Sequence, residues 1–142
     1  EVAYEIYELQ NTHQNVGLGM IGEFETPMEE YDFLALVKEK MQADGIRHST
    51  PVGKQIKKVA VLGGSGSYAI KNAIMAGADA FLTADLKYHQ FYEAENQLLL
   101  ADIGHFESER YTKNYIVDYL RKKILSFAII LSEENTNPVK YL

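Results

Sequence analysis

The chain contains no cysteine and no tryptophan among its 142 residues. Without cysteine it can form no disulfide and offers no thiolate metal ligand or cysteine nucleophile, so any metal ion would be held by histidine and carboxylate groups. An excess of positive charge is also missing, because 14 Lys and Arg stand against 20 Asp and Glu. The formal net charge of -6 argues against nucleic acid as a partner, since phosphate attracts basic surfaces.

Long apolar runs are absent as well. No run approaches the roughly 20 residues that a membrane-spanning helix needs, so we expect no membrane partner, and the lack of cysteine fits a reducing cytoplasm. The composition, 46% hydrophobic and 24% charged, is typical of a globular protein. The chain opens on Glu1-Val2-Ala3 rather than on methionine, which suggests a piece of a longer protein.

The first third of the chain contains signals for both strands and a helix. Residues 1–10 alternate apolar and polar side chains, as a half-buried strand does, and a glycine-rich strand is expected at 16–24. A helix should then run to about Gln42, with Thr26 as its cap, Pro27 at its first position and Glu29 completing a capping box. Residues 43–55 read as a loop with room for a short strand at 46–49.

A regular alternation of strands and helices begins at residue 57. Strands are expected at 57–64, 80–84, 98–104 and 127–134, with helices at 67–77, 87–97 and 108–124 between them. Strands that are apolar throughout and separated by helices indicate a sheet buried on both faces. We therefore predict an α/β fold with a mainly parallel or mixed sheet and helices on both faces.

Polar residues follow three of these strands in turn. They are the sequence "GGSGS" at 63–67, Asp85 after the second strand, and the stretch from Asp102 to Glu109 after the third. Ligands of open parallel sheets bind outside the carboxyl ends of the strands. We therefore expect the functional site at this edge.

His105 and Glu109 are four residues apart, which places both on one face of a helix. A histidine nitrogen and a glutamate oxygen so placed can reach one divalent cation. The same spacing also suits the polar start of a surface helix, and it recurs at His89 and Glu93. Two ligands are fewer than the three that catalytic zinc usually takes, so further ligands would have to come from elsewhere.

The "GGSGS" segment has three interpretations. Backbone N–H groups at such a strand-to-helix turn can bind an anion, but the segment departs from the dinucleotide fingerprint and lacks a P-loop lysine. It also resembles a nucleophile elbow around Ser65, with Ser67 where the last glycine belongs; a triad of Ser65, Asp85 or Asp102, and His105 would follow the order of such hydrolases. A tight turn without a ligand fits equally well.

Asp85 and His89 lie just past the strand at 80–84. Asp85 can cap the following helix. Alternatively, Asp85 and His89 contact a substrate or act as acid and base on a water molecule. Ser65, Asp85 and His89 are therefore our candidate substrate-binding residues.

Five segments, in this order, resemble the C-terminal half of the NGG-interacting-factor-like family, whose members are often labelled GTP cyclohydrolase I type-two homologues. They are "GLGMIGEF", "KKVAVLGGSGS", "GADAFLTADLKYHQ", "ADIGHFESER" and "SEENTNPVKYL". The resemblance implies one lobe of a two-lobed α/β protein that holds two divalent metal ions, of zinc, manganese or iron, and assembles into homohexamers. It also implies that His105 and Glu109 are metal ligands, through the family's Gly-His and Ser-Glu pairs.

Two departures accompany the resemblance. Thr83-Ala84-Asp85 stands where the family usually has Thr-Gly-Asp, and the family's paired-histidine motif does not occur in this chain. The resemblance implies that residues 1–15 are the exit strand of an inserted small α/β domain and that 16–142 are the C-terminal lobe. We expect the remaining metal ligands to lie in the N-terminal lobe of the two-lobed protein.

Two functions remain open at this point. In the first, the protein is a dinuclear metal-dependent hydrolase that acts on nucleotide or phosphoester substrates. In the second, it is a metal-binding oligomeric scaffold or regulatory protein without enzymatic activity.

Overall fold

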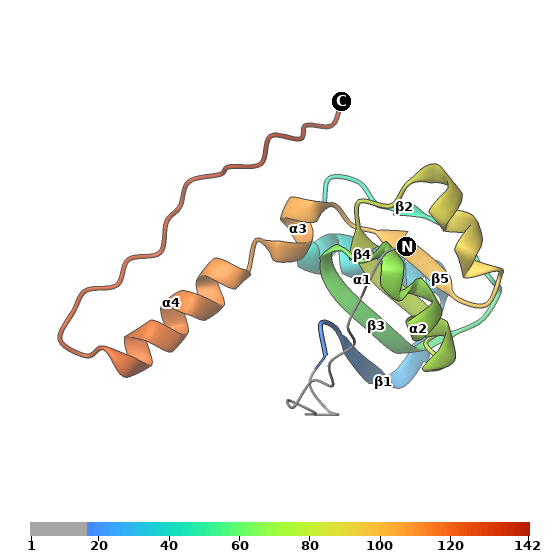
Figure 1. The fold of residues 1–142 in the computed structure, drawn as a ribbon, viewed down its shortest axis with the longest axis horizontal. Coiled ribbons are helices and arrows are strands. Elements are labelled where there is room, and N and C mark those ends of the chain that lie inside the picture. Colours follow the sequence, from blue (N-terminus) through green and yellow to red (C-terminus); the bar gives the residue numbers. More distant parts are fainter. Residues whose placement is uncertain (1–16) are drawn as a thin grey trace, which may run out of the picture.

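A single mixed sheet organises the computed structural model, which describes residues 17–142. The strand order is β1-β3-β4-β5-β2 (Figure 1). The three central strands, β3 (Ile56–Ser65), β4 (Ala80–Ala84) and β5 (Leu99–Asp102), run parallel. The two edge strands, β1 (Met20–Met28) and β2 (Arg47–His48), are antiparallel to their neighbours. The predicted α/β fold is confirmed, whereas the exit strand expected at 1–15 lies outside the described residues.

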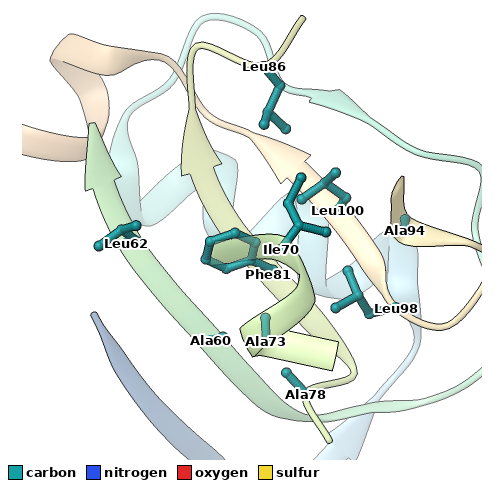
Figure 2. Close-up of a cluster of buried hydrophobic side chains, with 10 residues drawn as sticks. All are labelled: Ala60, Leu62, Ile70, Ala73, Ala78, Phe81, Leu86, Ala94, Leu98 and Leu100. Atoms are coloured by element: carbon teal, nitrogen blue, oxygen red, sulfur yellow. The ribbon is translucent and has the colours of Figure 1, made fainter. Parts of the chain in front are cut away.

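Helices cover both faces of this sheet because successive strand residues point to opposite sides. One face packs on α2 (Ile70–Met75) and the 3₁₀ helix η2 (Tyr88–Ala94). Figure 2 shows this cluster, in which Phe81 of β4 and Leu100 of β5 lie near Ile70 of α2. The other face packs on α1 (Glu30–Met41), through a second cluster that contains Phe33, Leu34, Val37, Val59, Ala80 and Leu99. Both faces are buried, as the apolar strands predict.

The helix expected from Thr26 begins later than predicted. β1 continues through Met28, which pairs with Ile56 of β3, so Thr26 and Pro27 belong to the strand. Glu29 is the residue before the helix, and its side chain makes no capping hydrogen bond. The predicted capping box is therefore wrong, because sheet pairing extends into the segment that carries it.

The C-terminal third also differs from the prediction. The helix expected at 108–124 is two helices, α3 (His105–Glu109) and α4 (Thr112–Lys123), preceded by Gly104 at a φ of 91°. The strand expected at 127–134 is not formed. Figure 1 shows this segment beyond α4 and away from the sheet, so its backbone has no strand to pair with. Within 17–142 no helix combines the length and apolar character needed to cross a membrane.

Candidate functional site

The carboxyl ends of the three parallel strands meet at one edge of the sheet, beside α3 (Figure 1). β3 ends at Ser65, β4 is followed by Asp85, and β5 ends at Asp102. His105 is the first residue of α3 and lies three positions after the end of β5 at Asp102. The parallel order of the strands thus brings segments that are distant in sequence to one place, as predicted.

The imidazole ring of His105 lies between two carboxylates. Its Nδ1 is 2.5 Å from Oδ2 of Asp85, and its Nε2 is 3.4 Å from Oε2 of Glu109. About half of each of these three side chains is exposed to solvent, so the group is open to a ligand. The structure brings together His105, Glu109 and Asp85, three of the residues singled out from the sequence.

A buried carboxylate ties the backbone segments of this group together. Asp102 is only 4% exposed, and its two oxygens accept hydrogen bonds from separate segments. Oδ2 accepts from the N–H of Leu86 at 2.9 Å and from the Arg47 guanidinium, while Oδ1 accepts from the N–H of Gly104 at 3.0 Å. Leu86 follows Asp85 and Gly104 precedes His105. The Asp102 carboxylate therefore anchors the backbone beside each member of the Asp85–His105 pair.

Gly64 makes room for the Glu109 carboxylate. Its φ is 67°, and a Cβ atom at this position would lie 2.6 Å from Oε1 of Glu109 and 3.5 Å from Cε1 of His105. The N–H of Gly64 donates to Oγ of Ser108 at 2.9 Å, and that hydroxyl donates to the carbonyl of His105 at 2.8 Å. Glycine and serine thus let α3 approach the end of β3 closely.

A pocket of about 560 Å³ adjoins the group, and Asp85, His105 and Glu109 are among its lining residues. Part of its wall comes from the C-terminal segment, because Asn137 donates to the buried Glu107 at 2.9 Å. Arg110 also lines the pocket, with its guanidinium 5.3 Å from the centre of the Phe106 ring. The pocket therefore combines carboxylates, an imidazole and cationic groups.

Two sequence candidates do not join this group. The hydroxyl of Ser65 makes no hydrogen bond to His105, whose two nitrogens face Asp85 and Glu109, so the hypothetical triad is not assembled. His89 lies in η2, where the centre of its ring is 5.2 Å from the centre of the Tyr88 ring, and it does not line the pocket. A substrate-binding role for Ser65 and His89 stays a prediction.

Sequence reasoning missed several residues that shape the site. The roles of Arg47 and Asn137 depend on contacts across 55 and 30 positions of the chain, which no local pattern reveals. Gly64 carried a usable signal, because a second glycine just before a strand-to-helix turn often marks a positive φ or a close approach.

The pKa of His105 is raised above 6.5, first by its hydrogen bond to Asp85 and further by the negative charges of Asp85 and Glu109, which outweigh the opposing effect of burial. A raised pKa means that the protonated ring is favoured on folding. The stabilisation of the fold by the protonated ring is complete below pH 6.5 and is lost as the pH rises through the pKa of the folded state.

We expect an NMR titration of His105 in the metal-free chain to give a pKa above 6.5, and we expect Asp85→Asn to lower this pKa. A wild-type pKa at or below 6.5 would contradict this.

The group fits one side of a metal site. Zinc bonds to nitrogen and oxygen are about 2.0–2.2 Å long, so two such ligands in tetrahedral arrangement lie roughly 3.4 Å apart. The Nε2 of His105 and Oε2 of Glu109 have this separation. Within residues 17–142, however, no three His, Asp or Glu side chains are grouped so that they could hold a metal ion. These residues therefore offer two ligands, and a complete site would need more.

The family model described as Duf34/NIF3 (NGG1p interacting factor 3) matches residues 2–138. A GTP cyclohydrolase 1 type 2 homolog of Bacillus subtilis is 35% identical over 147 residues, which cover 100% of this chain and 39% of that relative. A protein with the same name from Staphylococcus epidermidis is also 35% identical, over 92% of this chain and 37% of its own length. The chain thus spans about two fifths of the curated relatives that it matches.

Solved structures agree with this assignment. Staphylococcus aureus protein SA1388 is similar with a TM-score of 0.79 and 31% identity, over 89% of this chain and 37% of that one. A Bacillus cereus protein related to NIF3 has a TM-score of 0.77 and 31% identity, over 100% of this chain and 40% of its own. Sequence and fold therefore lead to one conclusion: the chain belongs to the Duf34/NIF3 (NGG1p interacting factor 3) family.

Proposed function

We propose that this chain supplies one side of a dinuclear divalent-metal site in a hydrolase-like protein that acts on nucleotide or phosphoester substrates. The observation that carries the proposal is the pair of His105 Nε2 and Glu109 Oε2, which face each other at 3.4 Å beside a pocket of about 560 Å³. The name of the relatives, GTP cyclohydrolase 1 type 2 homolog, supports a nucleotide as the substrate class.

The residues of the pocket have distinct tasks in this proposal. His105 and Glu109 would each donate one ligand atom, and zinc, manganese or iron at such a site would lower the pKa of a bound water and polarise the substrate. Arg110 lines the same pocket and makes no ion pair with a described carboxylate within 4.0 Å. Its guanidinium would bind an anionic part of the substrate, such as a phosphate.

The remaining ligands would come from outside this chain. The matched relatives are more than twice as long as the segment that aligns with it. We therefore propose that residues 16–142 form one lobe of a two-lobed protein whose other lobe completes the site. Its two metal ions would lie between the lobes, in a protein that works in the cytoplasm.

Exposed apolar side chains favour a second function, that of an oligomeric scaffold or regulatory protein. Tyr115 of α4 is 75% exposed, and Leu125 and Phe127 beyond it are 89% and 78% exposed. Apolar surface of this kind usually marks a contact with another chain or lobe. Assembly into a homohexamer would bury it, and such assembly is compatible with either function.

The two functions differ in one measurable property. We expect the full-length protein, loaded with zinc, manganese or iron, to hydrolyse at least one member of a panel of nucleotides and phosphoesters. His105→Ala should lower that activity to the level of the metal-free protein, because it removes a metal ligand. His48→Ala is the control, since His48 of β2 is exposed and does not line this pocket, and it should retain the activity.

Hydrolysis that survives in His105→Ala would place the chemistry elsewhere. If no compound in the panel is hydrolysed above the His105→Ala background, the enzymatic function is wrong and the scaffold function stands.

A further inference from the structure

We propose that Asp85 is a positioning residue for the candidate metal site. Its carboxylate holds the His105 ring so that Nδ1 carries the proton and the lone pair of Nε2 is free on the side of Glu109. This inference rests on the proposed function, because it concerns how one ligand is prepared for the metal.

The two nitrogens of the His105 ring have different partners and different roles. A neutral imidazole has one nitrogen that donates a hydrogen bond and one that accepts, and an ionised carboxylate can only accept. Asp85 lies 2.5 Å from Nδ1, so this nitrogen must be the donor. In the neutral ring the other nitrogen, Nε2, is then unprotonated, as a metal ligand must be, and it faces Glu109 at 3.4 Å. Carboxylates bonded to metal-binding histidines in this way fix both the tautomer and the direction of the ring.

The backbone at Asp85 supports a specific role. Its φ of 57° lies in the left-handed region, which few residues other than glycine adopt, although aspartate and asparagine do so more readily than most. Glycine would satisfy this conformation without strain. An aspartate here therefore brings a carboxylate to a position where the backbone alone favours glycine, and that carboxylate contacts His105.

The surrounding structure holds both partners in place. Asp102 accepts from the N–H groups of Leu86 and Gly104, the chain neighbours of Asp85 and His105. The side chain of Leu86 is only 2% exposed, which anchors the segment after Asp85 in the core. The Asp85–His105 contact is thus set by buried groups, although the two side chains are half exposed and their ion pair adds little to stability.

Three variants of the 142-residue chain separate the carboxylate from the backbone. Asp85→Gly removes the acceptor and relaxes the left-handed turn, and Asp85→Ala removes the acceptor but keeps the strain. Asp85→Asn keeps a neutral acceptor in a residue that tolerates this conformation. Asp118→Ala, an exposed carboxylate of α4, is the control.

The first readout is the tautomer of His105, measured by ¹⁵N NMR of the ring at a pH where it is neutral and without metal. We expect the wild-type chain and Asp118→Ala to carry the proton mainly on Nδ1, and Asp85→Asn, whose amide can accept from Nδ1 or donate to it, to do so in a smaller fraction. Asp85→Gly and Asp85→Ala should shift it toward Nε2. An unchanged Nδ1 population in Asp85→Gly and Asp85→Ala would overturn the inference.

The second readout is the apparent Kd for Zn²⁺ of the full-length protein with the same substitutions, from titrations followed at the His105 ring. Loss of such a supporting carboxylate typically weakens metal binding by about 10–100-fold, so we expect a Kd at least tenfold higher in Asp85→Gly and Asp85→Ala, with Asp85→Asn in between. Zinc binding at His105 with equal Kd in all variants would overturn the positioning role alone. If Zn²⁺ leaves the His105 signals of the full-length wild-type protein unchanged, the proposed metal site itself fails.

Discussion

Replacing Asp102 by alanine is expected to lower the free energy of unfolding by about 3–5 kcal/mol. The N–H groups of Leu86 and Gly104 would lose a charged acceptor, and each hydrogen bond of this type contributes roughly 1.5–3 kcal/mol. Urea denaturation followed by circular dichroism measures the change. Domains of this size are commonly stable by only about 5–15 kcal/mol, so the loss would be a large share of the total.

Asp102→Asn tests whether both oxygens matter. Oδ1 accepts from Gly104, while Oδ2 accepts from Leu86 and from Arg47. An asparagine has one acceptor oxygen, so its amide N–H₂ would face a donor on the other side. We expect a loss of the same sign as in the alanine variant, whereas Asp118→Ala on the exposed face of α4 should change stability by less than about 0.5 kcal/mol. Two Asp102 variants as stable as the wild type would show that water replaces the carboxylate.

Gly64→Ala is expected to damage the site more than the fold. The new methyl group would meet Oε1 of Glu109 at 2.6 Å, and the flexible carboxylate would move away from its place opposite His105. The left-handed backbone adds a cost of about 1–2 kcal/mol for any residue with a Cβ atom. We therefore expect a modest fall in stability and a Kd for Zn²⁺ raised roughly tenfold or more, because misplaced ligands bind metal poorly.

The neighbouring Gly63 provides the control. A Cβ atom there would lie 3.4 Å from the carbonyl oxygen of Ser108 and 3.7 Å from Cγ of Glu109, which are tolerable contacts, and its φ is not positive. Gly63→Ala should therefore bind Zn²⁺ nearly as the wild type does. Equal zinc binding in Gly63→Ala and Gly64→Ala would mean that Glu109 does not need its observed position.

The fold could be predicted where the hydrophobic pattern is regular. Residues 57–104 alternate apolar strands with helices, and the structure has β3, β4 and β5 in parallel there. The predictions failed where a segment depends on its surroundings. Thr26 carries a sound local capping signal, yet pairing with β3 extends β1 past it. Residues 127–134 are apolar enough for a strand, but no strand of the described residues lies beside them.

The site could be predicted in outline for a similar reason. Parallel strands end at one edge, so Asp85 and His105 had to lie near each other, and the spacing of four residues paired His105 with Glu109. Which nitrogen of His105 faces which carboxylate could not be predicted, because it depends on the turn at Asp85. The link from Arg47 to Asp102 joins residues whose contact only the folded chain creates.

The C-terminal segment has a consequence for the order in which the site is built during synthesis. Asn137 binds Glu107, and Tyr141 lies against Gly45 and lines the same pocket as His105. These residues follow the last strand of the sheet, β5, in sequence, so the wall that they form is completed after the sheet has been synthesised. Until these residues are in place, the edge of the sheet beside His105 is open to water on that side.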